Sequence, residues 1–188
     1  YYRYDKGYKP DFPGEADFKG EIVHPQFWPE TLDYSGKRVV IIGSGATAMT
    51  LVPAMTDKAA HVTMLQRSPT YVVSRPAVDG MANFLRKILP EQWAYDFVRG
   101  RNVVLQRCFS RRARTRPDKV RTALIDMVRK ELGPDYDVEK HFTPSYNPWE
   151  QRLCLVPDSD LFTALKSGKA SVETDHIERF TSSGVKLK

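Results

Sequence analysis

A short apolar run that ends in a glycine-rich turn constrains the fold of this chain more than any other feature. Val39-Val40-Ile41-Ile42 is β-branched throughout, which predicts a buried parallel strand. Gly43-Ser44-Gly45-Ala46-Thr47-Ala48 follows as a Gly-x-Gly-x-x-Ala turn and opens an apolar helix. A second strand over His61-Val62-Thr63-Met64-Leu65-Gln66 completes a βαβ unit. The predicted fold class is therefore α/β, with a Rossmann-like unit.

The residues of this turn suit a bound dinucleotide. Gly43 permits the tight turn, Gly45 lets the backbone approach a pyrophosphate, and Ala48 is small enough for the helix to pack on the strand. The pyrophosphate would lie at the helix N-terminus, where backbone N–H groups and the helix dipole favour an anion. In an NAD site an acidic residue usually follows the second strand and holds the 2′-hydroxyl of the ribose. Arg67 and Ser68 stand at this position instead, and they suit a 2′-phosphate. The turn and these two residues predict an NADP(H) site. The alternative is a Rossmann-like unit without a nucleotide, in which the glycines only make a turn.

The composition is that of a globular protein. The chain has 188 residues, a net charge of +6 and two cysteines, Cys108 and Cys154, whose spacing suits neither a disulfide framework nor a metal site. No apolar run approaches the roughly 20 residues of a transmembrane helix, and the first residues do not resemble a signal peptide. We therefore expect a cytoplasmic protein without a transmembrane segment or a bound metal.

The order of the predicted elements divides the chain into a connector, a Rossmann domain and an insertion. Residues 1–36 are rich in aromatic residues, Gly and Pro, which predicts an extended connector. The NADP-binding domain is expected at 37–74 and 150–188, and a helical insertion at 75–149. In the insertion we expect three helices, at about 78–89, 91–114 and 117–132, of which the second can break at Gly100. Irregular structure is expected at 135–157.

The end of the chain predicts a return to strands. A short helix is expected between Asp158 and Gly168, followed by strands at about 170–174 and 177–180. Residues 184–188 alternate like a strand cut in the middle of a hairpin. Because the sequence also starts at Tyr1 without an initiator methionine, we expect a piece of a longer protein.

A basic run in the predicted insertion admits two interpretations. Nine Arg and Lys residues within 99–121 stand against one acid, Asp118, and would contact phosphates if this module bound nucleic acid. The run also contains apolar residues that we expect in the core, Val103, Val104, Leu105 and Phe109. We therefore favour the solvated face of an amphipathic helix pair and expect no nucleic-acid partner.

Residues 18–29 form a second informative segment. Their sequence has the form F-x-G-x-x-x-H-x-x-x-W-P, with Phe18, Gly20, His24, Trp28 and Pro29 at its five specified positions. The pattern resembles the fingerprint of Baeyer–Villiger monooxygenases, class B flavoproteins that use NADPH, FAD and dioxygen. The resemblance implies that His24 is a hinge or linker residue, whereas a lone histidine in such a place is more often bonded to the backbone.

The resemblance extends along the whole chain. Five segments are similar to the ethionamide-activating subgroup of these enzymes: 1–8, 24–26, 43–48, 64–71 and 146–154. It implies that the chain is the NADPH-binding portion of an FAD-dependent monooxygenase, which inserts oxygen into ketones or oxidises sulfur compounds. It also implies that the FAD domain belongs to the same protein outside these residues, so that the fragment alone is inactive.

The resemblance points to one catalytic candidate, Arg152. The family has a Lys-Arg pair after the insertion, and Gln151-Arg152 stands in that place. It implies that the Arg152 guanidinium lies beside the flavin and stabilises an anionic oxidant. The alternative for Arg152 is a structural ion pair with a loop carboxylate. Gln151 departs from the lysine that helps hold the 2′-phosphate, which leaves more of that recognition to Arg67 and Ser68.

Two further functions remain open from the residues alone. The first is a free-standing NADP(H)-binding or redox-sensing module without flavin chemistry. The second is a nucleic-acid-binding helical module that uses the basic run.

Overall fold

Contacts between residues divide the chain into two compact units, and each is described by itself. Unit 1 holds Tyr1–Ser68 and Ser167–Lys188, and unit 2 holds Pro69–Lys166. The structure is a computed structural model that describes residue 5 and residues 7–188. Residues 1–4 and 6 begin the predicted connector and the first segment of the family resemblance, and they lie outside the described residues.

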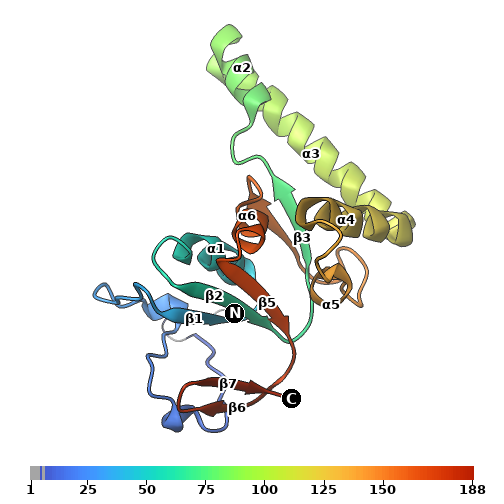
Figure 1. Cartoon of the computed structure of the whole chain (residues 1–188). Coiled ribbons are helices and arrows are strands. Elements are labelled where there is room, and N and C mark those ends of the chain that lie inside the picture. The colour runs from blue at the N-terminus through green and yellow to red at the C-terminus, as the bar shows by residue number, and fades with distance from the viewer. Residues whose placement is uncertain (1–4, 6) are drawn as a thin grey trace. The chain divides into compact units, whose positions relative to one another are not determined.

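Unit 1 contains the predicted βαβ arrangement. Strands β1 (Arg38–Ile42), β2 (His61–Gln66) and β5 (Ala170–Thr174) form a parallel sheet in the order β1-β2-β5. Helix α1 (Ala46–Met55) packs on β1 and β2 (Figure 1). The predicted strands at 38–42, 61–66 and 170–174 and the helix after the glycine turn are confirmed.

The core of unit 1 lies between α1 and the sheet. Met49 and Val52 of α1, and Val62 and Met64 of β2, expose 2% or less of their surface. β1 differs from the prediction of a buried strand, because it lies at the edge of the sheet. Its side chains alternate between half-buried and exposed, and Val40 and Ile42 are each 44% exposed. An edge strand pairs on one side only, so a run of apolar residues does not guarantee burial.

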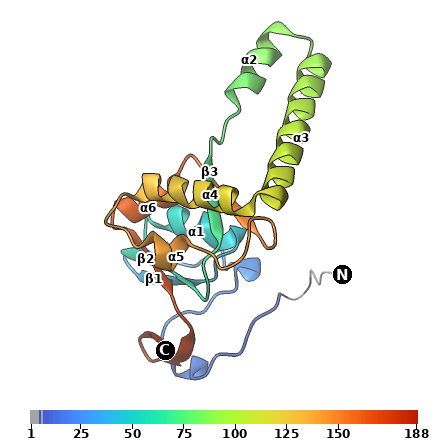
Figure 2. The same ribbon diagram turned by 90° about the vertical axis from the view of Figure 1, so that its right-hand side faces the viewer.

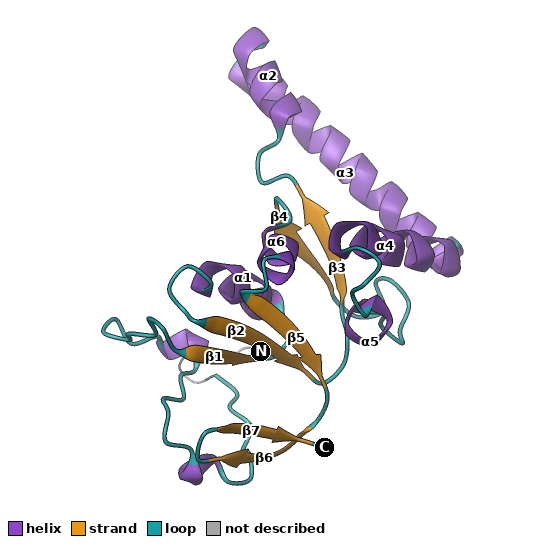
Figure 3. Cartoon of the chain, in the orientation of Figure 1, coloured by secondary structure: helices purple, strands orange, loops and turns teal. Residues whose placement is uncertain are grey.

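The rest of unit 1 is an irregular connector that meets a β-hairpin. Among its described residues, the connector has only two helical turns, η1 (Glu15–Asp17) and η2 (Pro25–Phe27). Strands β6 (Ile177–Thr181) and β7 (Gly184–Leu187) pair antiparallel within the chain, so the last strand is not left unpaired (Figure 3). Phe180 of β6 is buried and its ring contacts Phe12. The hairpin therefore anchors the connector.

Unit 2 is built around a second, smaller sheet. β3 (Tyr71–Arg75) and β4 (Leu153–Pro157) pair in parallel, with α4 (Pro117–Leu132) packed against β3 and α6 (Asp160–Lys166) against β4. Contacts thus group 69–74 and 150–166 with the helices, whereas the predicted domain boundaries place these residues in the Rossmann domain. The assignment of an NADP-binding domain and an insertion as functional domains stays a prediction.

Two helices of unit 2 form a long hairpin. α2 (Gly80–Ile88) is followed at once by α3 (Glu91–Thr115), and Figure 2 shows the two helices side by side and antiparallel. The expected break at Gly100 does not occur, because a glycine in a helix interior costs only about 1 kcal/mol relative to alanine. The expected core role of Val103, Val104 and Leu105 is wrong, since they are 57%, 59% and 59% exposed.

The segment predicted to be irregular contains two regular elements. α5 (Val138–Phe142) starts where the Asp137 side chain accepts a hydrogen bond from the Lys140 N–H, and β4 follows at 153–157. Phe142 is 2% exposed and its ring contacts Phe162 of α6. Both elements depend on partners distant in sequence, so their own residues give only a weak local signal.

Candidate functional site

The glycine turn is tied directly to the end of the neighbouring strand. The Gly43 N–H donates a 2.8 Å hydrogen bond to the Leu65 carbonyl, one position beyond the pairing of Ile42 with Leu65. Gly43 has φ +130°, a conformation that residues with a side chain rarely adopt. A Cβ at Gly43 would meet no atom of the described residues within 4 Å, so the backbone conformation and not crowding requires glycine here.

Helix α1 begins immediately after this turn. Gly45 precedes its first residue in an extended conformation, and among the described residues no side chain caps it. The first turn also contains no acidic residue, so no carboxylate competes for its backbone N–H groups. Ala48 is 5% exposed, which fits its predicted role in the packing of the helix on the strand. This end of α1 can accept an anion such as a pyrophosphate.

Arg67 and Ser68 lie at the same edge of the sheet as the glycine turn. They directly follow β2, whose last residues pair in parallel with the end of β1. Both side chains are exposed. A guanidinium and a hydroxyl are thus available beside the N-terminus of α1 for a phosphate group.

Two contacts that the sequence did not reveal fix this edge. Gln66 is 1% exposed and its amide Nε2 donates a 2.9 Å hydrogen bond to Thr174 Oγ1 at the end of β5. The Asp175 N–H donates to the Gln66 carbonyl over 3.0 Å. Together they hold the ends of β2 and β5 in register just before Arg67. The only sequence signal was a polar residue at the end of an apolar strand.

The fingerprint residues hold the connector together locally. The Phe18 ring lies over Gly20, where a Cβ would come within 2.6 Å of it, and packs edge-on to Phe180 with 6.0 Å between centroids. His24 Nδ1 accepts a 3.3 Å hydrogen bond from the Gln26 N–H and so caps η2. The geometry gives His24 a backbone partner, as expected for a lone histidine, and the hinge role stays a prediction.

The last two fingerprint residues, Trp28 and Pro29, follow η2. The Trp28 ring stands edge-on to Tyr34, with 6.4 Å between centroids, and remains 40% exposed. The Pro29 carbonyl accepts a hydrogen bond from the Leu32 N–H over 3.1 Å. These contacts turn the chain toward β1.

Arg152 lies in unit 2, directly before β4, with an exposed side chain and a firmly held backbone. Its carbonyl accepts hydrogen bonds from the Tyr146 hydroxyl at 3.1 Å and from the Thr70 hydroxyl at 3.4 Å. The two hydroxyl oxygens are 2.9 Å apart. The Tyr71 hydroxyl in turn donates to the Tyr146 carbonyl over 2.7 Å, and burial raises the pKa of Tyr71.

This hydroxyl network contacts the backbone carbonyl of Arg152. None of the ion pairs recorded among the described residues includes the Arg152 side chain. The alternative of a structural ion pair for Arg152 thus finds no partner carboxylate in the part of the chain that the structure describes. The Thr70–Tyr71–Tyr146 network was missed from the sequence, because its members are some 75 positions apart.

The two cysteines occupy different environments. Cys108 of α3 is exposed, and Cys154 of β4 is buried. Burial raises the pKa of the Cys154 thiol, which keeps it protonated and unreactive at neutral pH. Among the described residues, no group of three or more His, Cys, Asp or Glu side chains is arranged to hold a metal ion.

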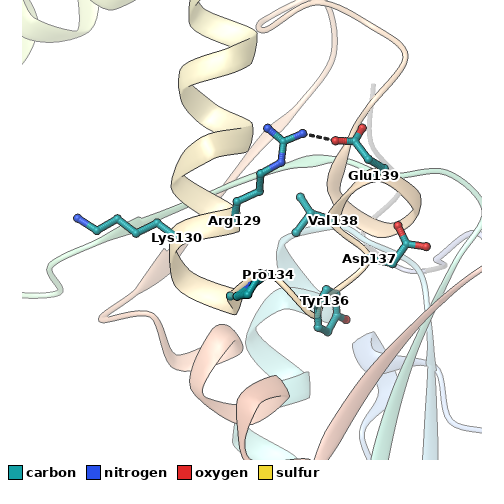
Figure 4. A pocket seen from close by; sticks show the side chains of 8 residues that line it. Arg129, Lys130, Pro134, Tyr136, Asp137, Val138 and Glu139 are labelled. Carbon is teal, nitrogen blue, oxygen red and sulfur yellow. Dashed lines mark hydrogen bonds and ion pairs between the residues drawn. The ribbon is translucent and has the colours of Figure 1, made fainter.

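A pocket of about 530 Å³ lies at the junction of α4 and α5, and none of the predicted site residues lines it (Figure 4). Three of its charged groups, those of Arg129, Asp137 and Glu139, are engaged. The Arg129 guanidinium forms ion pairs with Glu139 and Asp126, which raise its pKa, and Asp137 caps α5. This pocket is therefore not the site that the sequence predicts.

The fold and this turn define an α/β protein with a Rossmann-like unit, and comparison with known proteins gives its family. Residues 3–96 match the family described as flavin-binding monooxygenase-like. The chain belongs to this flavin-binding monooxygenase-like family. The family resemblance inferred from the sequence is confirmed.

Known monooxygenases match this chain over its whole length. It is 57% identical over 189 residues to the probable FAD-binding monooxygenase AlmA of Acinetobacter baylyi. It is 55% identical over 188 residues to the FAD-containing monooxygenase EthA of Mycobacterium tuberculosis. In both cases the match covers 100% of this chain and 38% of the relative, so the chain spans less than half the length of these relatives.

Solved structures agree with the fold. A steroid monooxygenase bound to NADP superposes with a TM-score of 0.70 at 17% identity, over 96% of this chain and 42% of that one. A cyclohexanone monooxygenase superposes with a TM-score of 0.69 at 18% identity, with the same coverage of both chains. The predicted α/β class with a Rossmann-like unit is confirmed.

Proposed function

We propose that this chain is the NADPH-binding portion of an FAD-dependent monooxygenase. The observation that carries the proposal is the hydrogen bond from Gly43 to Leu65, which sets the glycine turn beside the end of β2, where Arg67 and Ser68 follow. In this assignment the N-terminus of α1 holds the pyrophosphate, and Arg67 and Ser68 hold the 2′-phosphate. The names of AlmA and EthA support FAD as the second cofactor.

The open edge of the sheet favours a larger protein over a free-standing module. Among the described residues β1 pairs only with β2, and Val40 and Ile42 are each 44% exposed on it. Rossmann sheets continue past this strand with further parallel strands. We propose that additional polypeptide of the same protein, including its FAD domain, completes the fold, and that the fingerprint segment with His24 links the two parts.

The proposed reaction assigns separate tasks to the two sites. NADPH supplies two electrons to FAD, one oxygen atom of dioxygen enters the substrate and the other leaves as water. The residues at the glycine turn bind and orient NADPH. The Tyr146 and Thr70 hydroxyls hold the backbone carbonyl of Arg152. The guanidinium of Arg152 stabilises negative charge near the reacting oxygen. The proposed substrate is a small-molecule ketone or sulfur compound.

Arg67 tests the cofactor assignment. In the full-length enzyme, Arg67→Ala removes a charge-assisted hydrogen bond of about 1.5–3 kcal/mol, so the KM for NADPH should rise about tenfold or more. The KM for NADH should change little, because NADH lacks the 2′-phosphate. Arg38→Ala is the matched control, since Arg38 is an exposed arginine at the opposite end of the same sheet. Equal losses with both cofactors would contradict the role of Arg67.

Arg152 is tested separately. In the full-length enzyme, Arg152→Ala should abolish oxygenation of the substrate while reduction of the flavin by NADPH survives, with hydrogen peroxide released instead of product. Oxygen uptake, peroxide and product are measured together. A variant that oxygenates substrate at the normal rate, or that fails to fold, would make Arg152 a structural residue.

A cytoplasmic location is part of the proposal. It agrees with Cys108 and Cys154, which form no disulfide with each other. Among the described residues, no helix combines the length and apolar character needed to cross a membrane.

A further inference from the structure

The α2–α3 hairpin has an unusual surface. Its two helices touch along a line marked by buried alanines, Ala82 at 5% exposure and Ala94 at 1%. The Arg101 guanidinium of α3 pairs with Asp79, the residue that caps α2, which confirms the antiparallel alignment. Beyond this contact line, large apolar side chains of both helices are exposed to solvent.

Six of these side chains form what we call the apolar stripe. On α2 they are Met81, Phe84 and Ile88, which are 50%, 59% and 59% exposed. On α3 they are Trp93, Phe97 and Val104, which are 68%, 57% and 59% exposed. Spacings of three, four and seven residues place the members of each helix on one side of it. Exposed apolar surface that is continuous in this way marks a contact site.

The two halves of the apolar stripe lie on the same face of the hairpin. Met81 immediately precedes the buried Ala82, and Trp93 immediately precedes the buried Ala94. Each is therefore offset by about 100° in the same sense from the contact line of its helix. The two helices of an antiparallel pair are related by an approximate two-fold axis perpendicular to the plane that contains them. Side chains with equal offsets in the same sense therefore lie on the same face of the pair.

The charge of the hairpin is strongly positive. Residues 79–116 contain nine Arg and Lys residues and three acidic residues. One of these acids, Asp79, is already paired with Arg101. On α3 the side that carries Trp93, Phe97 and Val104 continues with Arg107, Arg111 and Arg114. The face is thus apolar and aromatic near the α2–α3 turn and basic toward α4.

We propose that this face of the α2–α3 hairpin docks on an anionic lipid bilayer. The apolar stripe enters the boundary between headgroups and acyl chains, and the basic half binds the anionic headgroups. Tryptophan and phenylalanine beside arginine are the side chains that favour this boundary. A nucleic-acid surface would use the arginines but would leave Met81, Phe84 and Ile88 without a role. The inference goes beyond the proposed function and does not depend on it.

Vesicle binding tests the proposal. The 188-residue chain and the full-length protein should both float with phosphatidylcholine vesicles that contain phosphatidylglycerol, and bind phosphatidylcholine alone much more weakly. In a chain with Trp28 and Trp149 replaced by Phe, the Trp93 emission should shift to the blue on binding. Trp93→Ser combined with Phe97→Ser should lower the partition coefficient by about tenfold or more.

A control on the opposite side of α3 makes the test specific. Tyr95 is 51% exposed on the same helix but outside the apolar stripe, so Tyr95→Ser should bind vesicles like the parent chain. Circular dichroism verifies that each variant keeps its helices. The proposal is overturned if neither protein binds vesicles, if only the shorter chain binds, if Tyr95→Ser weakens binding as much as the stripe variant, or if a nucleic acid binds through the same residues in place of vesicles.

Discussion

The Tyr146 hydroxyl offers a direct test of how unit 2 holds Arg152. Tyr146→Phe removes the 3.1 Å hydrogen bond to the Arg152 carbonyl and the 2.9 Å contact with the Thr70 hydroxyl. Each is a neutral hydrogen bond with a net contribution of about 0.5–1.5 kcal/mol. Thr70 is 3% exposed, and its hydroxyl keeps the longer 3.4 Å bond to Arg152 and its hydrogen bond with the Cys154 thiol. The ring contact with Tyr71, with 5.4 Å between centroids, survives in phenylalanine.

The expected loss is therefore about 1–2 kcal/mol, which lowers the melting temperature by roughly 2–8 °C for a chain of this size. Urea unfolding measures the free energy, and hydrogen exchange locates the change. Exchange should accelerate at β3 and β4 and stay unchanged at β1 and β2. Tyr8→Phe is the control, because Tyr8 is 87% exposed and its hydroxyl should contribute almost nothing. If the two variants have equal stability, the network does not hold the Arg152 backbone.

Three further predictions concern the turn, the thiols and the hairpin. Gly43→Ala should cost about 1–3 kcal/mol in thermal unfolding, more than Gly36→Ala, because Gly43 has φ +130° and Gly36 φ +66°. Neither added Cβ meets an atom of the described residues within 4 Å, so equal costs would contradict this reasoning. With a thiol reagent at neutral pH, Cys108 should react at once and Cys154 only after denaturant is added, and rapid reaction of both would show that β4 opens easily. The hydrogen bonds to Asp79 lower its pKa below that of the unfolded chain, so the stability they give is present above about pH 4 and is lost as the pH falls through the folded-state pKa. The helix content of α2 should decline in that pH range, and it should decline less in Asp79→Asn. Identical pH profiles of the two proteins would refute this prediction.

The sequence by itself determined the elements whose signals are local. Short-range hydrophobic patterns predict the strands at 38–42 and 61–66 and the helix between them. The spacing of the glycines between the first strand and the helix is typical of the dinucleotide-binding turn. The helix from Pro117 to Leu132 likewise has its own start and stop residues. The same local motifs were enough to indicate the family, because a fingerprint is a contiguous set of residues.

Only the tertiary structure decided which surfaces meet. The pairing of β3 with β4 joins residues about 80 positions apart, and it brings Thr70 and Tyr146 to the Arg152 carbonyl. The sequence also could not tell that Val104 would be exposed, since apolar periodicity marks a face of a helix but not the partner that covers it. Likewise, four β-branched residues predict a strand at β1, but its place at the edge of the sheet depends on strands elsewhere in the chain. Local hydrogen bonding is encoded in neighbouring residues, whereas burial and site assembly depend on contacts between distant ones.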